Sequence, residues 1–295
     1  MPAAAAEGRE RSGKERHGKM EKIAIQGVEG SFHDMAAHGY FPGEEVRLVC
    51  CDTFEGIFEE MHKDSACLGL MAIENTIAGS LLPNYELLRA GGATVVGEHK
   101  LHIAHSLLCL PGDDWDTVTE VNSHPVALAQ CRGFLSRHPG MKAVETADTA
   151  GAAADIARRG LRGHAAICSA AAAELYGLKV LAQGIEDNKH NYTRFLLLCD
   201  PARAGRYRTE AQTDKSSLVF SLPHEEGALA RVLSVFSFYN ANLTKIQSLP
   251  VIGHEWEYLF YVDVAYADHT RYLQCIEAVR PLTKALRELG VYKGK

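Results

Sequence analysis

The chain has 295 residues, a length that accommodates two domains of ordinary size. Its composition, 46% hydrophobic and 23% charged, is typical of a globular protein. The formal net charge of −6, without any basic stripe, argues against a nucleic-acid-binding surface. No uninterrupted apolar run reaches membrane-spanning length, so the sequence also predicts no membrane segment.

The first twenty residues, MPAAAAEGRERSGKERHGKM, contain no apolar segment after their charges. We therefore expect residues 1–20 to form a disordered extension and not a signal peptide. None of the eight cysteines forms a C-x-x-C pair, which indicates buried thiols in a reducing cytoplasm. His99, His102 and His105 are three residues apart, but a strand places His102 on the opposite face from the other two. We therefore expect no metal site, and His105 either lines a cleft or is hydrogen-bonded in the core.

Residues 21–200 alternate short apolar runs with helical stretches. The predicted strands lie at about 22–27, 46–51, 67–73, 101–110, 117–122, 141–146, 164–168 and 193–199. The predicted helices lie near 32–40, 53–63, 81–90, 125–137, 149–159 and 169–176. This alternation predicts an α/β fold with a mostly parallel sheet. The number of strands favours two lobes with a ligand cleft between them.

Residues 201–215 are polar and rich in turn formers, and we expect a linker there. The pattern then changes over 216–295, where we predict strand 216–222, helix 227–239, strands 243–249 and 256–264, helix 269–288 and strand 289–293. The order β-α-β-β-α-β predicts a ferredoxin-like module.

Small polar residues follow five of the predicted strands, at positions where helices should begin: Ser31, Asn75, Thr76, Ser80, Asn122, Ser123, Asp148, Thr149 and Ser169. At any single position, ordinary helix capping is the more frequent role. In a parallel sheet, however, helix N-termini gather at one edge, where their free N–H groups attract anions. The set therefore predicts a site for a small carboxylate.

Thr193 and Arg194 lie at the mouth of an apolar strand, in NKHNYTRFLLLCD at 188–200. A guanidinium binds a carboxylate in a bidentate manner, and a threonine hydroxyl beside it donates a hydrogen bond. We therefore predict that both side chains contact the anion, although an isolated Arg194 would more often form a surface salt bridge.

Several motifs resemble segments of the prephenate dehydratase family, in the order found in that family. They are GVEGSF at 27–32, AIENTIAG at 72–79, SHPVALAQC at 123–131, DTAGAA at 148–153 and NYTRF at 191–195. Residues 216–293 resemble an ACT domain, an amino-acid-sensing module, and GALA at 227–230 is similar to its phenylalanine-binding turn. The implied fold is a two-lobed catalytic domain like a type II periplasmic binding protein, followed by the ACT domain.

The resemblance implies conversion of prephenate to phenylpyruvate, carbon dioxide and water without a cofactor. It implies that Thr193 is the catalytic hydroxyl. The implied substrate-binding residues are Ser31, Asn75, Thr76, Ser123, Gln130, Thr149, Arg194 and Phe195. The implied allosteric site for L-phenylalanine comprises Gly227, Ala228, Leu229, Ala230, Gln247 and Ser248.

The C-terminal module departs from the ACT pattern at 247–250, where QSLP stands in place of Glu-Ser-Arg-Pro. This change leaves the strength of L-phenylalanine inhibition open. We expect a homodimer or homotetramer formed through the ACT domains, and transmission of the effector signal through the 201–215 linker.

Two other functions remain open on the sequence. One is the same chemistry on arogenate, which carries an amino group where prephenate has a ketone. The other is a non-catalytic, two-lobed protein that binds a small anion. Glu74 is either a proton source beside Asn75 or, more simply, a structural carboxylate.

Overall fold

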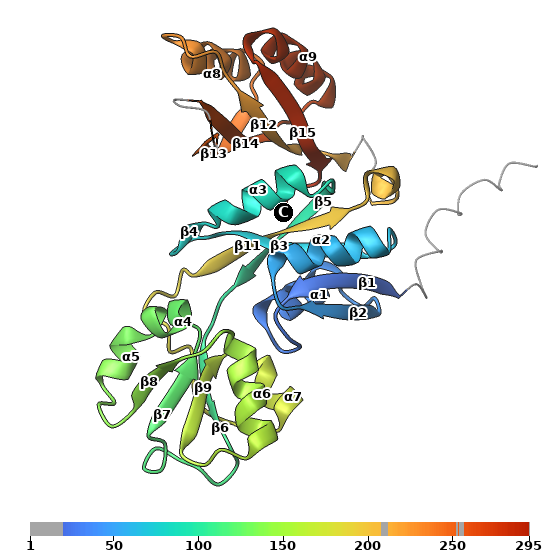
Figure 1. Cartoon of the computed structure of the whole chain (residues 1–295). Coiled ribbons are helices and arrows are strands. Elements are labelled where there is room, and N and C mark those ends of the chain that lie inside the picture. The colour runs from blue at the N-terminus through green and yellow to red at the C-terminus, as the bar shows by residue number, and fades with distance from the viewer. Residues whose placement is uncertain (1–19, 208–211, 252, 254–256, 295) are drawn as a thin grey trace, which may run out of the picture.

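The computed structural model describes residues 20–207, 212–251, 253 and 257–294. The predicted extension at 1–20 lies outside these residues, apart from Met20. Figure 1 shows three parts along one axis: the C-terminal domain at the top, a first lobe in the middle and a second lobe below. Within the described residues, no helix combines the length and apolar character needed to cross a bilayer.

The first lobe is a mixed sheet with helices on both faces. Its strand order is β2 (Val46–Cys51), β1 (Glu21–Gln26), β3 (Leu68–Asn75), β11 (Tyr192–Cys199) and β5 (Thr94–His102), with β4 (Gly79–Ser80) paired to β3. Helix α1 (Phe32–Tyr40) packs on one face, and α2 (Phe54–Lys63) and α3 (Leu82–Ala90) pack on the other. Because side chains alternate along a strand, Phe195 packs on the α1 face and Leu196 on the α2–α3 face.

The second lobe has an equivalent strand order. It runs β8 (Lys142–Glu145), β7 (Glu120–Ser123), β9 (His164–Cys168), β6 (Ser106–Cys109) and β10 (Lys179–Gln183). Here β6, the strand after the first crossing between the lobes, takes the place that β11 has in the first lobe. Its helices are α4 (Pro125–Gln130), α5 (Arg132–Ser136), α6 (Thr149–Arg159) and α7 (Ala171–Tyr176). The chain crosses between the lobes twice, after β5 and again before β11. Strand β11, which returns to the first lobe, is therefore antiparallel to both of its neighbours.

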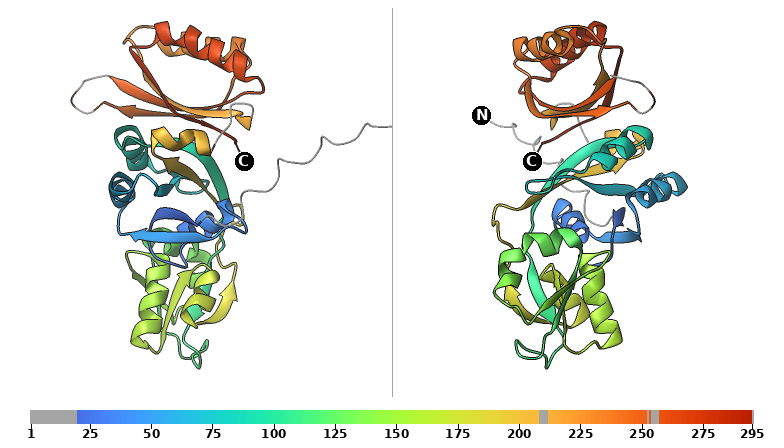
Figure 2. Two further views of the ribbon diagram at one scale, coloured as in Figure 1. Left: turned by 90° about the vertical axis from the view of Figure 1, so that its right-hand side faces the viewer. Right: turned by 60° about the vertical axis from the view of Figure 1, so that its left-hand side comes forward.

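The C-terminal domain follows a short helix, η1 (Pro201–Arg206). It consists of β12 (Lys215–Ser221), α8 (Ala228–Phe238), β13 (Asn242–Pro250), β14 (Tyr258–Ala265), α9 (His269–Val279), η3 (Arg280–Leu282) and β15 (Ala285–Tyr292). The sheet is antiparallel, in the order β13-β14-β12-β15. One face packs against α8 and α9, and the other packs Val219, Tyr261 and Leu289 against the first lobe. Figure 2 shows this sheet lying between its own helices and the first lobe.

Several features of the structure differ from the sequence predictions. The helix predicted at 125–137 is two helices, α4 and α5, separated at Cys131. The strand predicted at 101–110 is two strands, because residues 103–105 cross between the lobes. Strand β10 was not predicted, and the sheets are more mixed than expected. The helix predicted at 269–288 ends at Val279, before Pro281, and the following residues form η3 and β15.

Candidate active site

A cavity of about 500 Å³ lies between the two lobes. The first lobe contributes Ser31, Asn75, Thr193 and Phe195 to its wall, and the second contributes Gln130 and Thr149. Its size suits a small-molecule ligand. These six predicted site residues are thus brought together although they are spread over more than 160 positions of the chain.

Four helices begin at the wall of this cavity. Their N-caps are Ser31 (α1), Thr53 (α2), His124 (α4) and Asp148 (α6), and each accepts a hydrogen bond from a backbone N–H close behind it. Helix N-termini carry a partial positive charge, so together they favour a ligand with carboxylate groups. The expected helix starts at Ser31 and Asp148 are confirmed at the cleft. The polar residues expected to start the other helices are not their N-caps, because α3, α4 and α7 have Leu81, His124 and Ala170 in that position.

The hydroxyl of Thr193 has a defined hydrogen-bonding role. Asn75 Oδ1 accepts from the backbone N–H groups of Ile77 (2.9 Å) and Ala78 (2.8 Å), which fixes the orientation of its amide. Asn75 Nδ2 therefore donates to Thr193 Oγ1, at 3.0 Å. Within the described residues nothing accepts the Thr193 hydroxyl proton, so this O–H is available as a donor to a ligand.

A chain of side-chain hydrogen bonds continues from Asn75 into the second lobe. Asn75 donates to Asn191 Oδ1 (2.8 Å), and Asn191 Nδ2 donates to Gln130 Oε1 (3.0 Å). Gln130 Oε1 also bonds to His105 Nε2, at 2.9 Å. Because that oxygen only accepts, the neutral His105 ring carries its proton on Nε2, and Nδ1 is left as an acceptor. The chain links the two lobes directly behind Thr193.

Two histidines in the cleft wall are held neutral by burial, which lowers the pKa of His105 and lowers that of His33 to about 4. The His33 ring meets the Phe195 ring edge-on, with 4.9 Å between centroids. His105 Nδ1 and His33 Nε2 have no hydrogen-bond partner within the described part of the chain. Both nitrogens are therefore unused polar atoms at the cleft.

We expect the His33 imidazole to stay neutral well below pH 6. An unfolded histidine gains its proton near pH 6.5, whereas folded His33 gains it only near pH 4. The stability that His33 contributes is therefore fully present above pH 6.5 and is lost as the pH falls toward 4. Ring NMR signals from pH 7 to 4, assigned with a His33→Gln variant, test this. A midpoint near 6.5 would contradict it.

The cleft wall carries carboxylates but no strong cation. Asp52, Glu55 and Asp148 line it, and no lysine or arginine is found among the described lining residues. The positive potential therefore comes from the helix N-termini alone, and a ligand with an ammonium group would meet complementary charge.

Three predicted substrate contacts lie elsewhere. Arg194 does not reach the cleft: strand alternation directs it to the opposite face, where Glu98 and Asp263 bind it. Ser123 is fully buried and donates to the Ile167 carbonyl at 2.5 Å. Thr76 donates to the His190 carbonyl at 2.9 Å and lies outside the cavity lining. The placement of all three is structural, and the prediction that Arg194 grips a substrate carboxylate was wrong.

Two polar residues of the site, Asn191 and His33, were not predicted from the sequence. Asn191 belongs to the NYTRF motif and is fully buried in the hydrogen-bond chain. His33 was overlooked because nothing in its sequence context distinguishes it from a surface histidine at a helix start. The repeated polar residues at 188, 190 and 191 before an apolar strand were the available signal for Asn191.

Residues predicted to bind L-phenylalanine lie at one end of the C-terminal sheet. Gly227 has φ +72° and caps α8, whose first residues are Ala228, Leu229 and Ala230. Gln247 and Ser248 lie near the end of β13, where Leu249 and Ser221 flank Leu259 of β14. The turn before α8 and the QSLP stretch therefore share one end of the sheet.

Within the described part of the chain, no group of three or more His, Cys, Asp or Glu side chains is arranged to hold a metal ion. The eight cysteines are free thiols, and seven of them are buried.

The family model for prephenate dehydratase matches residues 23–203. Arogenate dehydratase 5 of Arabidopsis thaliana, a chloroplastic protein, is 40% identical over 295 residues; the match covers 94% of this chain and 68% of that protein.

Two solved structures are similar to this chain over nearly its whole length. Prephenate dehydratase from Arthrobacter aurescens, in complex with L-Phe, has a TM-score of 0.81 and 28% identity, covering 92% of this chain and 89% of that one. GqqA, described as a novel type of quorum-quenching acylase, has a TM-score of 0.82 and 30% identity, covering 93% and 98%.

Proposed function

The chain belongs to the prephenate dehydratase family, and we propose that it is a lyase that converts prephenate to phenylpyruvate in aromatic amino acid synthesis. The observation that carries this proposal is the Thr193 hydroxyl, which Asn75 orients inside a cleft surrounded by helix N-termini. Ser31, Gln130, Thr149 and Phe195 form the remaining proposed contacts, at the cleft wall.

For this reaction the protein needs mainly to orient the substrate and to donate one strong hydrogen bond to the departing oxygen. The ring carboxylate leaves as carbon dioxide, its bonding electrons form a ring double bond, and the hydroxyl on the opposite ring carbon leaves. The ring becomes aromatic, which supplies the driving force. Because negative charge develops on the departing oxygen, a donor placed there lowers the barrier. We assign that donor to the Thr193 O–H, and the departing hydroxide takes its proton from water.

The proposal is tested by incubating the purified chain with prephenate and following phenylpyruvate by its absorbance in alkali. Turnover that a Thr193→Val variant loses supports the assignment. Binding of prephenate without turnover, measured by calorimetry, would instead support a non-catalytic binding protein.

A second substrate, arogenate, is favoured by the acidic cleft. Prephenate is a dianion, whereas arogenate adds an ammonium group that suits Asp52, Glu55 and Asp148. The chemistry at the ring is the same, so Thr193 keeps its proposed role with either substrate. Parallel assays for phenylpyruvate and phenylalanine decide between them.

Asp148→Asn should separate the two substrates. Asparagine still caps α6, because its carbonyl accepts from Gly151 N–H as Asp148 Oδ1 does now. Loss of the charge should lower kcat/KM for arogenate by roughly three- to ten-fold, about 1 kcal/mol of Coulomb energy in a solvated cleft, and should not lower it for prephenate. Asp155→Asn, on the same helix but outside the cleft lining, is the control. Equal effects on both substrates would argue against a role for the ammonium group.

An acylase activity, as named for GqqA, finds less support in this cleft. A threonine nucleophile needs a base that accepts its proton. Thr193 Oγ1 instead accepts from the Asn75 amide, and within the described residues no basic side chain bonds to it. The arrangement suits a hydrogen-bond donor better than a nucleophile.

We propose that the C-terminal domain is an ACT domain that binds L-phenylalanine and pairs chains into a homodimer or homotetramer. The β-α-β-β-α-β order and the glycine turn at Gly227 support this assignment. Calorimetric titration with L-phenylalanine, together with the mass measured in solution with and without it, tests both parts. If L-phenylalanine produced no heat of binding and left the reaction rate unchanged, the C-terminal domain would serve at most to assemble the oligomer.

The eight free thiols support a reducing compartment. We propose the cytoplasm; the relative from Arabidopsis thaliana is named as chloroplastic.

A further inference from the structure

Six charged side chains form one cluster where the C-terminal sheet meets the first lobe. The lobe contributes Arg194, Glu98 and Glu74, with a net charge of −1, and the sheet contributes Lys215, Asp263 and Lys245, with a net charge of +1. Five of the six side chains are at most 10% exposed, so water screens their interactions little. The charges balance only when the two domains are docked.

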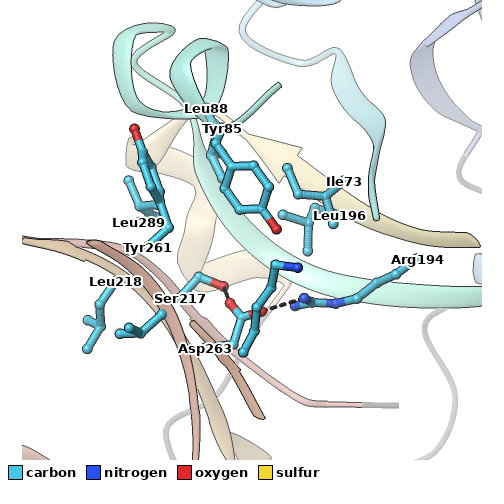
Figure 3. A pocket seen from close by; sticks show the side chains of 12 residues that line it. Ile73, Tyr85, Leu88, Arg194, Leu196, Ser217, Leu218, Tyr261, Asp263 and Leu289 are labelled. Carbon is cyan, nitrogen blue, oxygen red and sulfur yellow. Dashed lines mark hydrogen bonds and ion pairs between the residues drawn. The ribbon is translucent and has the colours of Figure 1, made fainter. Parts of the chain in front are cut away.

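Arg194 lies at the centre of this cluster. Its Nε donates to Glu98 Oε2 at 2.6 Å, one terminal nitrogen donates to Asp263, and the other donates to the Tyr292 hydroxyl at 2.9 Å. Figure 3 shows Arg194 reaching from its strand to Asp263 on the C-terminal sheet, where Ser217 also binds Asp263. Burial opposes ionisation of Arg194, but Asp263, Tyr292 and Glu98 outweigh it and raise its pKa well above the usual value.

Glu74 makes a second connection to the same domain. Lys245 Nζ lies 2.9 Å from Glu74 Oε1 and 2.8 Å from Ser80 Oγ. Lys245 is on β13, two positions before Gln247 of the proposed effector site. Glu74 is thus a structural carboxylate on the side of the sheet away from the cleft.

The register of the sheet places these anchors directly beside the cleft donor. Thr193 of β11 pairs with Asn75 of β3, and the next pair is Arg194 with Glu74. Thr193 and Asn75 are hydrogen-bonded to each other at the cleft, whereas Arg194 and Glu74 are both bound by the C-terminal domain. Thr193 is therefore one peptide unit from Arg194, and Asn75 is one peptide unit from Glu74. The C-terminal domain binds the side chains of Arg194 and Glu74.

We propose that Arg194 and Glu74 are positioning residues, through which the C-terminal domain sets the geometry of the Thr193–Asn75 pair. A hydroxyl that donates to a departing oxygen loses most of its effect when it is displaced by about 1 Å. The route runs through direct contacts between the domains and does not need the 201–215 linker. Because β13 carries both Lys245 and the QSLP stretch, an effector bound there would act on the same pair.

Asp263→Asn and Lys245→Met test the proposal, which rests on the proposed dehydratase activity for its kinetic readout. We expect kcat to fall about ten-fold or more and KM to change less than about three-fold, because geometry at the reacting oxygen is altered and the cleft wall is not. Arg287→Ala is the matched control: it breaks another interdomain hydrogen bond, to the Arg89 carbonyl at 2.7 Å, that is not attached to β3 or β11. It should leave both constants within about two-fold.

A double-mutant cycle separates positioning from a general structural role. In a Thr193→Ala background, Asp263→Asn should have no further effect on the residual rate, because the hydroxyl that it positions is gone. Multiplied effects would overturn the proposal. Should Asp263→Asn fold poorly, Arg194→Met/Asp263→Leu removes both charges and leaves Glu98 with Lys215, and Ser217 with Tyr292. That variant should fold and show the same loss of kcat.

Hydrogen exchange gives a readout that does not depend on turnover. Asp263→Asn should speed amide exchange at residues 192–195, and Arg287→Ala should not. Faster exchange in a chain that converts neither prephenate nor arogenate would support the coupling and refute the proposed activity. Unchanged exchange together with unchanged kcat in Asp263→Asn would overturn the coupling itself.

Discussion

Thr193→Ala should lower kcat by about 10²–10³-fold with little change in KM, the scale seen when one donor to a developing negative charge is lost. The backbone of β11 and the Asn75 amide remain, so the loss isolates the hydroxyl. Thr193→Val, which keeps the shape of the side chain, should show the same loss. Steady-state rates with prephenate and arogenate measure the effect.

Thr193→Ser is the matched control, because it retains the hydroxyl and its acceptor site for Asn75 Nδ2. It should keep the rate within about ten-fold of the natural protein, since serine only adds rotamer freedom. A Thr193→Val variant as active as the natural chain would contradict the assignment of the donor.

Arg194→Met should lower the free energy of unfolding by about 3–5 kcal/mol, the cost of leaving a buried ionic group without its partner. The guanidinium is replaced by a side chain that fills similar space, while Asp263 and Glu98 stay buried with one partner fewer. Loss of this pairing should also weaken docking of the C-terminal domain. Chemical denaturation followed by circular dichroism and by tyrosine fluorescence measures both effects.

Arg158→Met is the control for this experiment. Arg158 also pairs with a carboxylate, that of Asp155, but it is 76% exposed, and exposed pairs contribute only about 0–1 kcal/mol. Comparable stability losses in the two variants would mean that the interdomain cluster contributes no more than a surface ion pair.

The sequence predicted best those helices whose ends are marked by a capping residue or a terminal glycine. Helices 32–40 and 149–159 match α1 and α6 to the residue, because Ser31 and Asp148 cap their starts and Gly160 ends the second in a left-handed conformation. The break between β5 and β6 carries no such signal. Residues 103–105 continue the apolar pattern, since Ile103 and His105 are buried where the chain passes between lobes.

The sequence predicted which residue types form the site better than it predicted the direction in which each side chain points. Polar residues after strands identified the cleft, and Thr193 and Phe195 do line it. The prediction for Arg194 was wrong because side chains alternate along a strand, so Arg194 lies on the opposite face from its neighbours Thr193 and Phe195. That alternation is readable from the sequence, but Glu98 and Asp263, the partners that hold Arg194, are about 70 to 100 positions away.

The most direct test is a crystal structure with a substrate analogue whose saturated ring keeps the hydroxyl and both carboxylates but cannot become aromatic. We predict that the analogue occupies the cavity between the lobes, with its ring hydroxyl within about 3 Å of Thr193 Oγ1 and a carboxylate facing the helix starts. An analogue bound there with its hydroxyl turned away from Thr193, or bound outside the cavity, would contradict this account.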